Sequence, residues 1–423
     1  MRKVTIILLG FLLLLHSSCS SELNQYSHSA IPPESVNYKD LPALRIGLYH
    51  HMQNDPTTVG FIMFDLLGGC IQGRTGSPIN TINGLLSPLN SNVVSQWNGY
   101  YHALYQMNNV LGIINGFPET VLTRQTKGEA LYFRAYIYFN LAARWGDVPL
   151  LKTNTMDKPA RSPLSEVWSF IEEDLELAQE LLPNNAKNEY FICKDAATAL
   201  LARVSLSQGK MEKAKEYAES LIKSGRYHLD SFEKIFRKQA NGEVIFAFEN
   251  KNEESGINIS DLFYTYAHPN KGQGRYQPSP AFIKLFSDED KRLDITFVDV
   301  AGSTCINKYP SGQTGRDPFI VARIAEMYLI SAEAQGPAGI SRLNELRAAR
   351  GLSPLATSSK EEYIDLLLDE RRREFVGENM LYHDLVRTNR AIKDLGILPH
   401  QTLLPIPGKE LQLNDNLTPN PGY

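Results

Sequence analysis

The chain has 423 residues, of which 21% are charged, and its formal net charge at pH 7 is −4. Loss of an N-terminal signal that contains Arg2 and Lys3 would make the net charge more negative still. This balance excludes nucleic acid as the ligand, because nucleic-acid binding needs a basic stripe or patch. The length allows a large buried core, so we expect two lobes or one extended helical domain.

Residues 1–18 predict a lipoprotein signal peptide. Arg2 and Lys3 precede an apolar run, residues 4–15, that is too short to span a bilayer and has the length of a secretory signal core. Small residues then lead into Cys19, which resembles the lipidated cysteine of bacterial lipoproteins, although His16 stands where leucine is usual. We expect export, a lipid such as palmitate on Cys19 as the only membrane anchor, and a lipid-proximal linker over residues 19–40. An ordinary secreted protein is the alternative.

Amphipathic helices are predicted repeatedly over residues 41–240, which we expect to form an N-terminal helical repeat region. Apolar residues recur at helical spacing in six segments: 41–53, 92–115, 122–145, 164–182, 196–208 and 211–224. The last two make a helix–turn–helix of about 34 residues with small residues at facing positions, which is typical of a tetratricopeptide repeat. The later stretch "FIVARIAEMYLISAEAQGPAGISRLNELRAARGL" has the same shape, and its first helix is expected to end at a Gln-Gly pair as the earlier one does.

The helix over residues 122–145 is predicted to lie in the centre of the core. Tyr132, Phe133, Tyr136 and Phe139 cannot all face solvent, so this helix must pack against neighbours on more than one side. Gly146 can adopt the left-handed conformation that ends a helix, and a proline three residues later prevents the helix from resuming.

Residues 241–310 predict a loop-rich, ligand-binding region. A short strand pattern, "EVIFAFE", precedes a long stretch rich in Asn, Gly, Pro and aromatic residues, "GINISDLFYTYAHPNKGQGRYQPSP". Loops of this length are usually functional or disordered, and the aromatic content favours function. Residues 311–423 are expected to form a C-terminal helical region that ends in a structural clasp.

Four segments in order resemble one known family. They are "WNGYYHALYQMNNVLGII" from Trp97, "RAYIYFNLAARWGDVPL" from Arg134, "DERRREFVGENMLYHDLVR" from Asp369, and the C-terminal "LLPIPGKELQLNDNLTPNPGY". Together with the lipoprotein signal they resemble the SusD/RagB family of nutrient-binding outer-membrane lipoproteins of Bacteroidetes. The resemblance implies a mainly α fold, in which a tetratricopeptide-like core carries an irregular, loop-rich lobe with a few short strands.

The resemblance also implies a role at the outer membrane. Such a protein binds a nutrient, most often an oligo- or polysaccharide, and delivers it to a SusC-like TonB-dependent porin. Only one acid, Glu22, follows Cys19 closely, where surface-exported lipoproteins of this phylum tend to carry several. We expect a lipid-anchored protein that is exposed at the cell surface, and the periplasmic face stays open as an alternative. The sequence does not identify the glycan.

Two segments offer candidate ligand-binding residues. Glycan recognition uses flat aromatic faces together with amides, carboxylates or guanidinium groups that bind hydroxyls. The first segment, residues 261–276, offers five candidates: Tyr264, Tyr266, His268, Arg275 and Tyr276. Tyr264 and Tyr266 are two apart and would face the same side of an extended strand, either toward ligand or over the core. In the second segment, residues 65–84, the resemblance implies that Arg74, Asn80 and Asn83 contribute to the ligand surface.

No catalytic residues are predicted, and the protein is not expected to be an enzyme. The chain lacks a GxSxG nucleophile elbow, and the resemblance implies binding without turnover. A pair of glycosidase carboxylates, defined only by their separation in space, cannot be judged from sequence. The string "GGCIQGRT" has arginine where a phosphate-binding loop needs lysine. The main alternative is a helical-repeat lipoprotein that binds a peptide or protein in its concave face.

No metal site and no cofactor are predicted. His50 and His51 lack a second ligand pair at metal-binding spacing, and no HExxH motif occurs. The remaining cysteines, Cys70, Cys193 and Cys305, are too widely spaced for a zinc site, and we expect small buried apolar residues with at most one disulfide. The run "DERRRE" at residues 369–374 predicts ion pairs along a helix rather than an anion site.

Overall fold

The computed structural model describes residues 35–423 of the chain. The predicted signal peptide and the predicted lipidation site, Cys19, lie outside the described residues. Residues 35–40 belong to a separate N-terminal unit, where η3 (Tyr38–Asp40) is a 3-10 turn and the backbone N–H of Asn37 donates to the Asp40 carboxylate over 2.9 Å. Residues 41–423 form one compact unit. Within residues 35–423, no helix has both the length and the apolar character that a membrane crossing requires.

The compact unit is mainly α-helical, as the sequence predicts. The six helices expected in its N-terminal part are present, and their ends differ from the predicted ones by at most two residues: α2 (Leu41–Asn54), α5 (Ser91–Ile114), α6 (Val121–Trp145), α7 (Leu164–Leu181), α8 (Lys194–Ser207) and α9 (Met211–Lys223). The C-terminal part contains α14 (Ile324–Ala334), α15 (Ile340–Ala349), α16 (Lys360–Phe375), α17 (Leu381–Arg387), α18 (Ala391–Leu395) and α19 (Gly408–Leu413).

Shorter helices connect these elements. They are η4 (Thr58–Phe61), α3 (Met63–Leu67), α4 (Pro78–Leu85), α10 (Phe232–Phe236), α11 (Ile259–Phe263), α12 (Pro280–Ile283), α13 (Leu293–Thr296), η5 (Gly336–Gly339) and η6 (Pro399–Thr402). Several of them lie in the predicted loop-rich region, which therefore holds more regular structure than its composition indicates.

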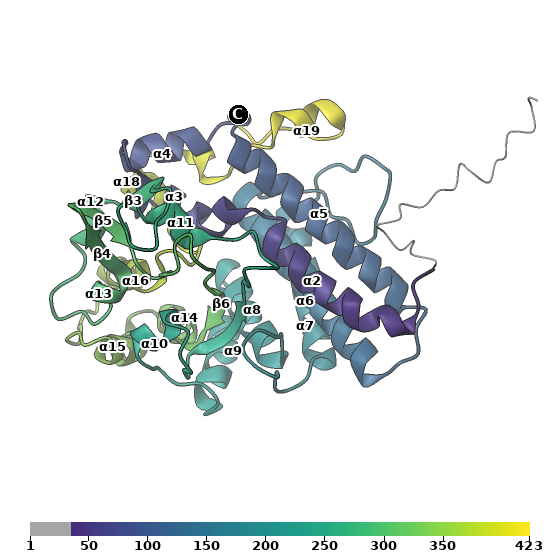
Figure 1. Cartoon of the computed structure of the whole chain (residues 1–423), viewed down its shortest axis with the longest axis horizontal. Helices are drawn as coiled ribbons and strands as arrows, with labels where there is room; N and C mark the ends of the chain where they lie inside the picture. The colour runs from purple at the N-terminus through teal and green to yellow at the C-terminus, as the bar shows by residue number, and fades with distance from the viewer. Residues whose placement is uncertain (1–34) are drawn as a thin grey trace, which may run out of the picture. The chain divides into compact units, whose positions relative to one another are not determined.

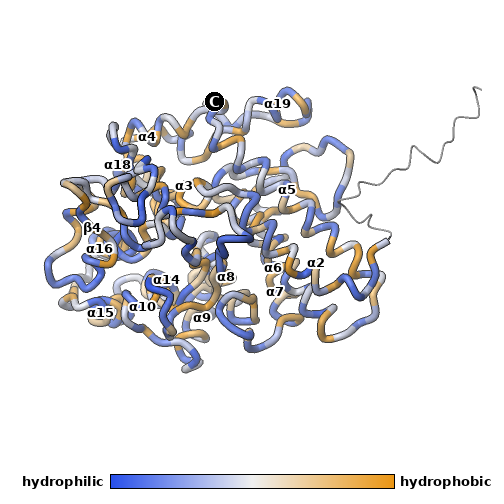
Figure 2. The backbone as a smooth tube through the Cα atoms, viewed as in Figure 1, coloured by the Kyte–Doolittle hydropathy of each residue, from blue (hydrophilic) through white to orange (hydrophobic). Residues whose placement is uncertain are grey.

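The longer helices pack as a succession of neighbours. In Figure 1, α2, α5, α6 and α7 lie together on one side of the compact unit, and the short helices and strands between α11 and β5 lie on the other. Next along the chain, α7 contacts α8, α8 pairs with α9, and α9 contacts α14, which pairs with α15. Hydrophobic and hydrophilic residues alternate along α2 and α5 in Figure 2, as expected of helices that bury one stripe. The two predicted helix pairs thus belong to one layered core.

Six strands form three antiparallel pairs. They are β1 (Ile71–Gly73) with β3 (Tyr276–Pro278), β2 (Val244–Phe248) with β6 (Phe319–Arg323), and β4 (Phe297–Val300) with β5 (Ser303–Ile306). The "EVIFAFE" segment is a strand, as predicted. Residues 319–323 are a strand too, whereas the sequence predicts them as the start of the second repeat's first helix. The expectation is wrong because this segment, which begins with the aromatic and β-branched residues Phe319, Ile320 and Val321, pairs with β2, so α14 begins only at Ile324.

Helix α6 lies at the centre of the core, as its aromatic residues predict. Every residue from Gly128 to Trp145 is buried. Gly146 follows the helix with φ 73° and ψ −117°, and a Cβ atom there would lie 2.9 Å from the Leu403 side chain. Glycine is therefore needed both for the positive φ and for the close approach. Beyond Gly146 the chain is no longer helical, and the buried Val148 forms an isolated antiparallel bridge with Ser162.

The C-terminal residues fasten onto the end of α6. The indole N–H of Trp145 donates to the Pro405 carbonyl over 3.0 Å, and the amide of Asn420 donates to the carbonyls of Trp145 and Leu404. Arg161 donates to the Thr418 carbonyl over 3.0 Å. The bond from Asn420 to the Trp145 carbonyl, and one from the Leu404 backbone N–H to the Arg144 carbonyl over 2.7 Å, satisfy carbonyl groups that the helix end leaves without intrahelical partners.

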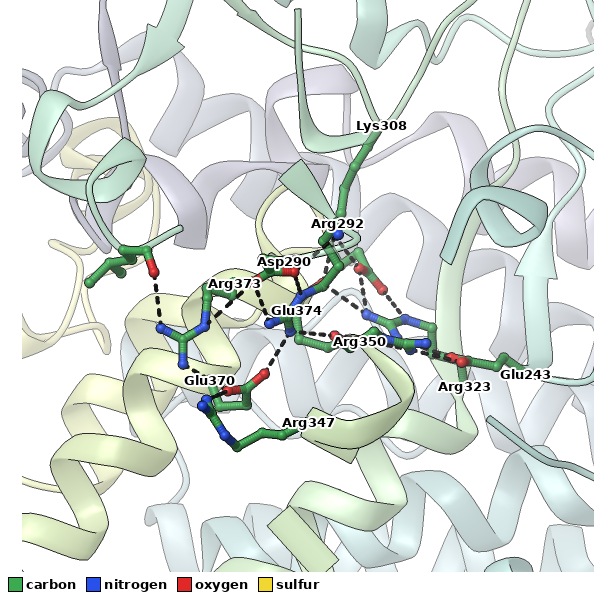
Figure 3. A network of polar contacts seen from close by, with 12 residues as sticks. Glu243, Asp290, Arg292, Lys308, Arg323, Arg347, Arg350, Glu370, Arg373 and Glu374 are labelled. Carbon is green, nitrogen blue, oxygen red and sulfur yellow. Dashed lines mark hydrogen bonds and ion pairs between the residues drawn. The ribbon is translucent and has the colours of Figure 1, made fainter. Parts of the chain in front are cut away.

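A buried ion-pair network joins the loop-rich region to the C-terminal helices. Its side chains, all fully buried, are Arg292, Lys308, Arg323, Arg350, Glu243, Asp290, Glu370, Glu374 and Glu378. Figure 3 shows Glu374 on α16 among the guanidinium groups of Arg292, Arg323 and Arg350. Burial alone would raise the pKa of Glu374, but these three arginines outweigh it and hold that pKa well below its ordinary value.

Two other buried groups bear on reactivity. The three cysteines in the described part of the chain, Cys70, Cys193 and Cys305, are free and buried, and burial raises the pKa of the Cys70 thiol to about 12. His383 on α17 stacks on Phe64, and its Nε2 lies 2.9 Å from the Ser207 hydroxyl. Burial and the nearby charge of Arg387 lower the pKa of His383 to about 3.

Candidate functional site

The strand pair β1–β3 brings the two predicted ligand segments together. Ile71 pairs with Pro278 and Gly73 pairs with Tyr276, and the ladder continues where the backbone N–H of Arg74 donates to the Arg275 carbonyl over 3.1 Å. Residues 65–84 and 261–276, far apart in sequence, therefore meet along one antiparallel ladder. We call the surface that these two segments share the paired-loop surface.

Arg74 is the brace of the paired-loop surface. Its guanidinium donates to the Gly274 carbonyl over 2.8 Å and to the Phe263 carbonyl over 3.2 Å, with a further bond to the Tyr276 carbonyl at 3.4 Å. The side chain is half-buried beneath the loop that it holds. Because most of its donors are engaged by the protein itself, the structure gives Arg74 a positioning role.

Tyr264 and Tyr266 do not face the same side, contrary to the expectation for an extended segment. Tyr264 caps α11 and is 1% exposed, whereas Tyr266 is 73% exposed. The Tyr264 hydroxyl donates to Asn307 over 2.6 Å, and its ring stacks on His268 with the centroids 3.6 Å apart. Burial raises the pKa of Tyr264 and lowers the pKa of His268. The stacked rings of Tyr264 and His268 therefore support the loop from its inner side, and Tyr266 is the ring exposed to solvent.

Charged side chains lie beside Tyr266. The ammonium of Lys271 lies over the Tyr266 ring, 4.7 Å from its centroid, and 3.4 Å from its hydroxyl, so a cation–π contact covers one face of the ring. Arg275 is exposed on the same loop, and Tyr276 is half-buried against the core. The arrangement offers one apolar ring face together with cationic donors for hydroxyl or carboxylate oxygens.

Asn80 and Asn83 lie on a helix rather than on a loop. Helix α4 begins after Ser77, whose hydroxyl caps it by accepting from the Asn80 backbone N–H. Both side chains are exposed, and their spacing of three residues places them on neighbouring positions of one helix face. Two further amides thus stand on the segment that carries β1.

A groove of about 680 Å³ adjoins the other side of α4. Its apolar wall comes from α4, α12 and α16, with Ile82, Phe282 and Leu368 among the lining residues. The charged rim is formed by Asp365, Asp369, Arg372, Lys393 and Asp394. Sequence reasoning missed this groove. The available signal was the spacing of Asp365, Asp369 and Arg372, which places three charges on one face of α16.

The arginines of "DERRRE" all form ion pairs. Arg371 pairs with Asp384 at 2.6 Å, Arg372 with Asp369 at 2.8 Å, and Arg373 with Glu370 at 2.7 Å. Arg371 is buried and makes an interior contact, whereas Arg372 and Asp369 are partly exposed at the groove.

Known proteins share this fold and its segments. A family model described as "Starch-binding associating with outer membrane" matches residues 45–206, and one described as "SusD family" matches residues 297–398. SusD-like protein P2 of Formosa agariphila is 26% identical, with 100% of this chain and 99% of that protein covered. SusD-like protein P38 of the same organism is also 26% identical, with 94% of each covered.

Solved structures agree in fold. A laminarin binding SusD-like protein has a TM-score of 0.79 at 23% identity, covering 92% of this chain and 100% of that one. Surface glycan-binding protein A from Bacteroides fluxus has a TM-score of 0.75 at 21% identity, covering 92% and 100%. The helical pairs and the loop-bearing lobe define a protein of the SusD-like fold. The chain belongs to the SusD/RagB family.

Proposed function

We propose that this chain is a non-catalytic, lipid-anchored protein of the outer membrane that binds an oligo- or polysaccharide at the cell surface. It delivers this ligand to a SusC-like TonB-dependent porin. Family membership supports the role, and two proteins of the same fold carry names that state laminarin and surface glycan binding. The lipid anchor at Cys19 and the porin partner rest on the resemblance to the family.

The observation that carries the proposal is the meeting of the two ligand segments at the β1–β3 ladder. An isolated exposed tyrosine is common, but Tyr266 stands on a loop that Arg74 holds in place and that the buried Tyr264 and the half-buried His268 support. A sugar ring can stack its C–H face on Tyr266 while Arg275, Asn80 and Asn83 bind hydroxyls. Tyr276 contributes the half-buried base of the site.

Isothermal titration of the purified protein against a panel of glycans and a peptide digest tests the proposal. We expect binding to one glycan class, and a loss of at least about tenfold in affinity for Tyr266→Ala, which corresponds to about 1.4 kcal/mol. The matched control is Tyr105→Ala, because Tyr105 is 51% exposed but lies on α5. Its affinity should equal that of the wild type.

Two results would contradict the proposal. If Tyr266→Ala keeps full affinity for a glycan that the wild type binds, the paired-loop surface is not the site. If only the peptide digest binds, the result favours the alternative of a helical-repeat lipoprotein that binds a peptide or protein. Chromatography of the glycan after incubation with the protein checks for turnover, and released products would show an enzyme. Co-purification with a TonB-dependent porin from the native membrane tests delivery.

A further inference from the structure

Two histidines and one carboxylate converge where α2 ends beside α5. His51 lies in the last turn of α2, Asp55 follows that helix directly, and His102 lies on α5. The Nδ1 atom of His51 is 3.1 Å from Asp55 Oδ2, and the Nδ1 atom of His102 is 2.8 Å from the same oxygen. One ligand atom from each residue lies within 4.8 Å of the others.

The backbone brings these residues together through a close helix contact. The backbone N–H of Asp55 donates to the His51 carbonyl over 3.0 Å, so the two side chains share one face of the last turn. A Cβ atom on Gly99 would lie 2.0 Å from the Asp55 carbonyl oxygen. Glycine at that position therefore lets the end of α2 touch α5, and His102, three residues further on, presents its ring one turn away.

We propose that His51, Asp55 and His102 form a binding site for a divalent late transition-metal ion, with Zn²⁺ as the best match. Two imidazole nitrogens and one carboxylate oxygen are a three-ligand set that zinc accepts, with water in the fourth position. Imidazole ligands disfavour Mg²⁺ and Ca²⁺, which prefer oxygen. His102 is 57% exposed and the other two side chains are partly exposed, so an ion can enter from solvent.

Metal binding requires a defined proton rearrangement. A carboxylate oxygen only accepts, so in the metal-free protein each neutral ring carries its proton on Nδ1 and donates it to Asp55. On binding, each Nδ1 gives up this proton and offers its lone pair to the ion, while Nε2 takes up one from solvent. The three ligand atoms then lie about 2.0–2.2 Å from zinc. Small rotations of the partly exposed side chains are enough to bring the three ligand atoms to these distances.

The ion would link α2 to α5 and, through Asn54, to the loop-rich region. The side chain of Asn54, the residue before Asp55, accepts from the Gly256 backbone N–H over 2.8 Å and donates to the Glu254 carbonyl over 3.3 Å. The competing explanation is a hydrogen-bonded brace of two histidines on one acid. Such a hydrogen-bonded contact would not bind zinc, so a zinc titration distinguishes the two explanations.

Calorimetric titration of the EDTA-treated protein, without a histidine tag, with ZnCl₂ tests the site. We expect one ion per chain, and at least tenfold weaker binding for His102→Ala and for Asp55→Asn. Co²⁺ should give the visible absorption bands of a four- or five-coordinate ion, and these should disappear in His102→Ala. Titration with MgCl₂ should give no binding.

The matched control is His228→Ala. His228 is an exposed histidine whose Nε2 lies 3.9 Å from an Asp230 oxygen, and within residues 35–423 this pair has no third metal-binding side chain close to it. This variant should bind zinc as the wild type does. Circular dichroism in EDTA should be unchanged for every variant, so that loss of metal is not loss of fold. Absence of zinc binding, or equal binding by the wild type, His102→Ala and Asp55→Asn, would overturn the proposal.

Discussion

Removal of the Glu374 charge is expected to lower the free energy of unfolding more than the loss of a surface ion pair does. Glu374 accepts from Arg323 at 2.5 Å and from Arg350 at 2.7 Å through one oxygen, and from Arg292 at 2.8 Å through the other. Glu374→Gln keeps the shape but leaves three buried guanidinium groups without their shared counter-ion. Breaking a buried ion pair costs about 3–5 kcal/mol, and the three partners favour the upper end.

Urea unfolding at pH 7, followed by circular dichroism, measures this cost. The control Glu119→Gln removes the same charge from an exposed pair with Arg124 at 2.9 Å, and it should cost about 0.5 kcal/mol or less. The slope of the unfolding free energy against urea should match the wild type in both variants, so that midpoints can be compared. If Glu374→Gln loses less than about 1 kcal/mol, desolvation of the network offsets its attraction and the network does not hold the lobes together.

Three further predictions concern packing, pH and the paired-loop surface. Gly99→Ala should destabilise by about 1–3 kcal/mol in thermal melts because its Cβ meets the Asp55 carbonyl, whereas Gly112→Ala, open on the same helix, should stabilise by about 0.5–1 kcal/mol. The pKa of His383, lowered to about 3, lies below the unfolded value of 6.5, so unfolding takes up a proton below pH 6.5. From pH 7 to 5 the free energy of unfolding should therefore fall by up to about 2 kcal/mol more than in His383→Gln, and equal falls would refute this. Arg74→Met should lower the free energy of unfolding by about 1.5–3 kcal/mol and weaken glycan binding. An unchanged melting temperature would show that Arg74 does not stabilise the loop.

Local pattern was sufficient to predict the helices of the core. The apolar spacing that predicts residues 122–145 is a property of the helix itself, and α6 spans Val121–Trp145. Strand β6 could not be found this way, because its partner β2 lies 71 to 79 residues earlier and the adjoining α14 shares its apolar character. A strand of five residues takes its identity from pairing, which the sequence does not display.

The candidate site could be predicted from the sequence only in part, for the same reason. Composition identified both segments of the paired-loop surface, but not that Tyr264 turns inward while Tyr266 turns out. The sequence did not indicate that His51, Asp55 and His102, for which we propose metal binding, lie together, because His51 and His102 come from different helices and only the close approach at Gly99 places them near one carboxylate. Spacing along the chain predicts ligands within one helix, and cannot predict ligands that helix packing brings together.

The fastening of the α6 end has a consequence for how the chain folds during synthesis. Trp145 bonds to Pro405 across 260 residues, and Asp65 bonds to Gly377 across 312. A ribosome adding about 5–20 residues per second needs roughly 13–50 s to pass from the first member of the Trp145 contact to the second. During that interval α6, which is buried from Gly128 to Trp145 in the folded protein, lacks the partners that cover its C-terminal end, so nascent chains should depend on chaperones until the last helices emerge.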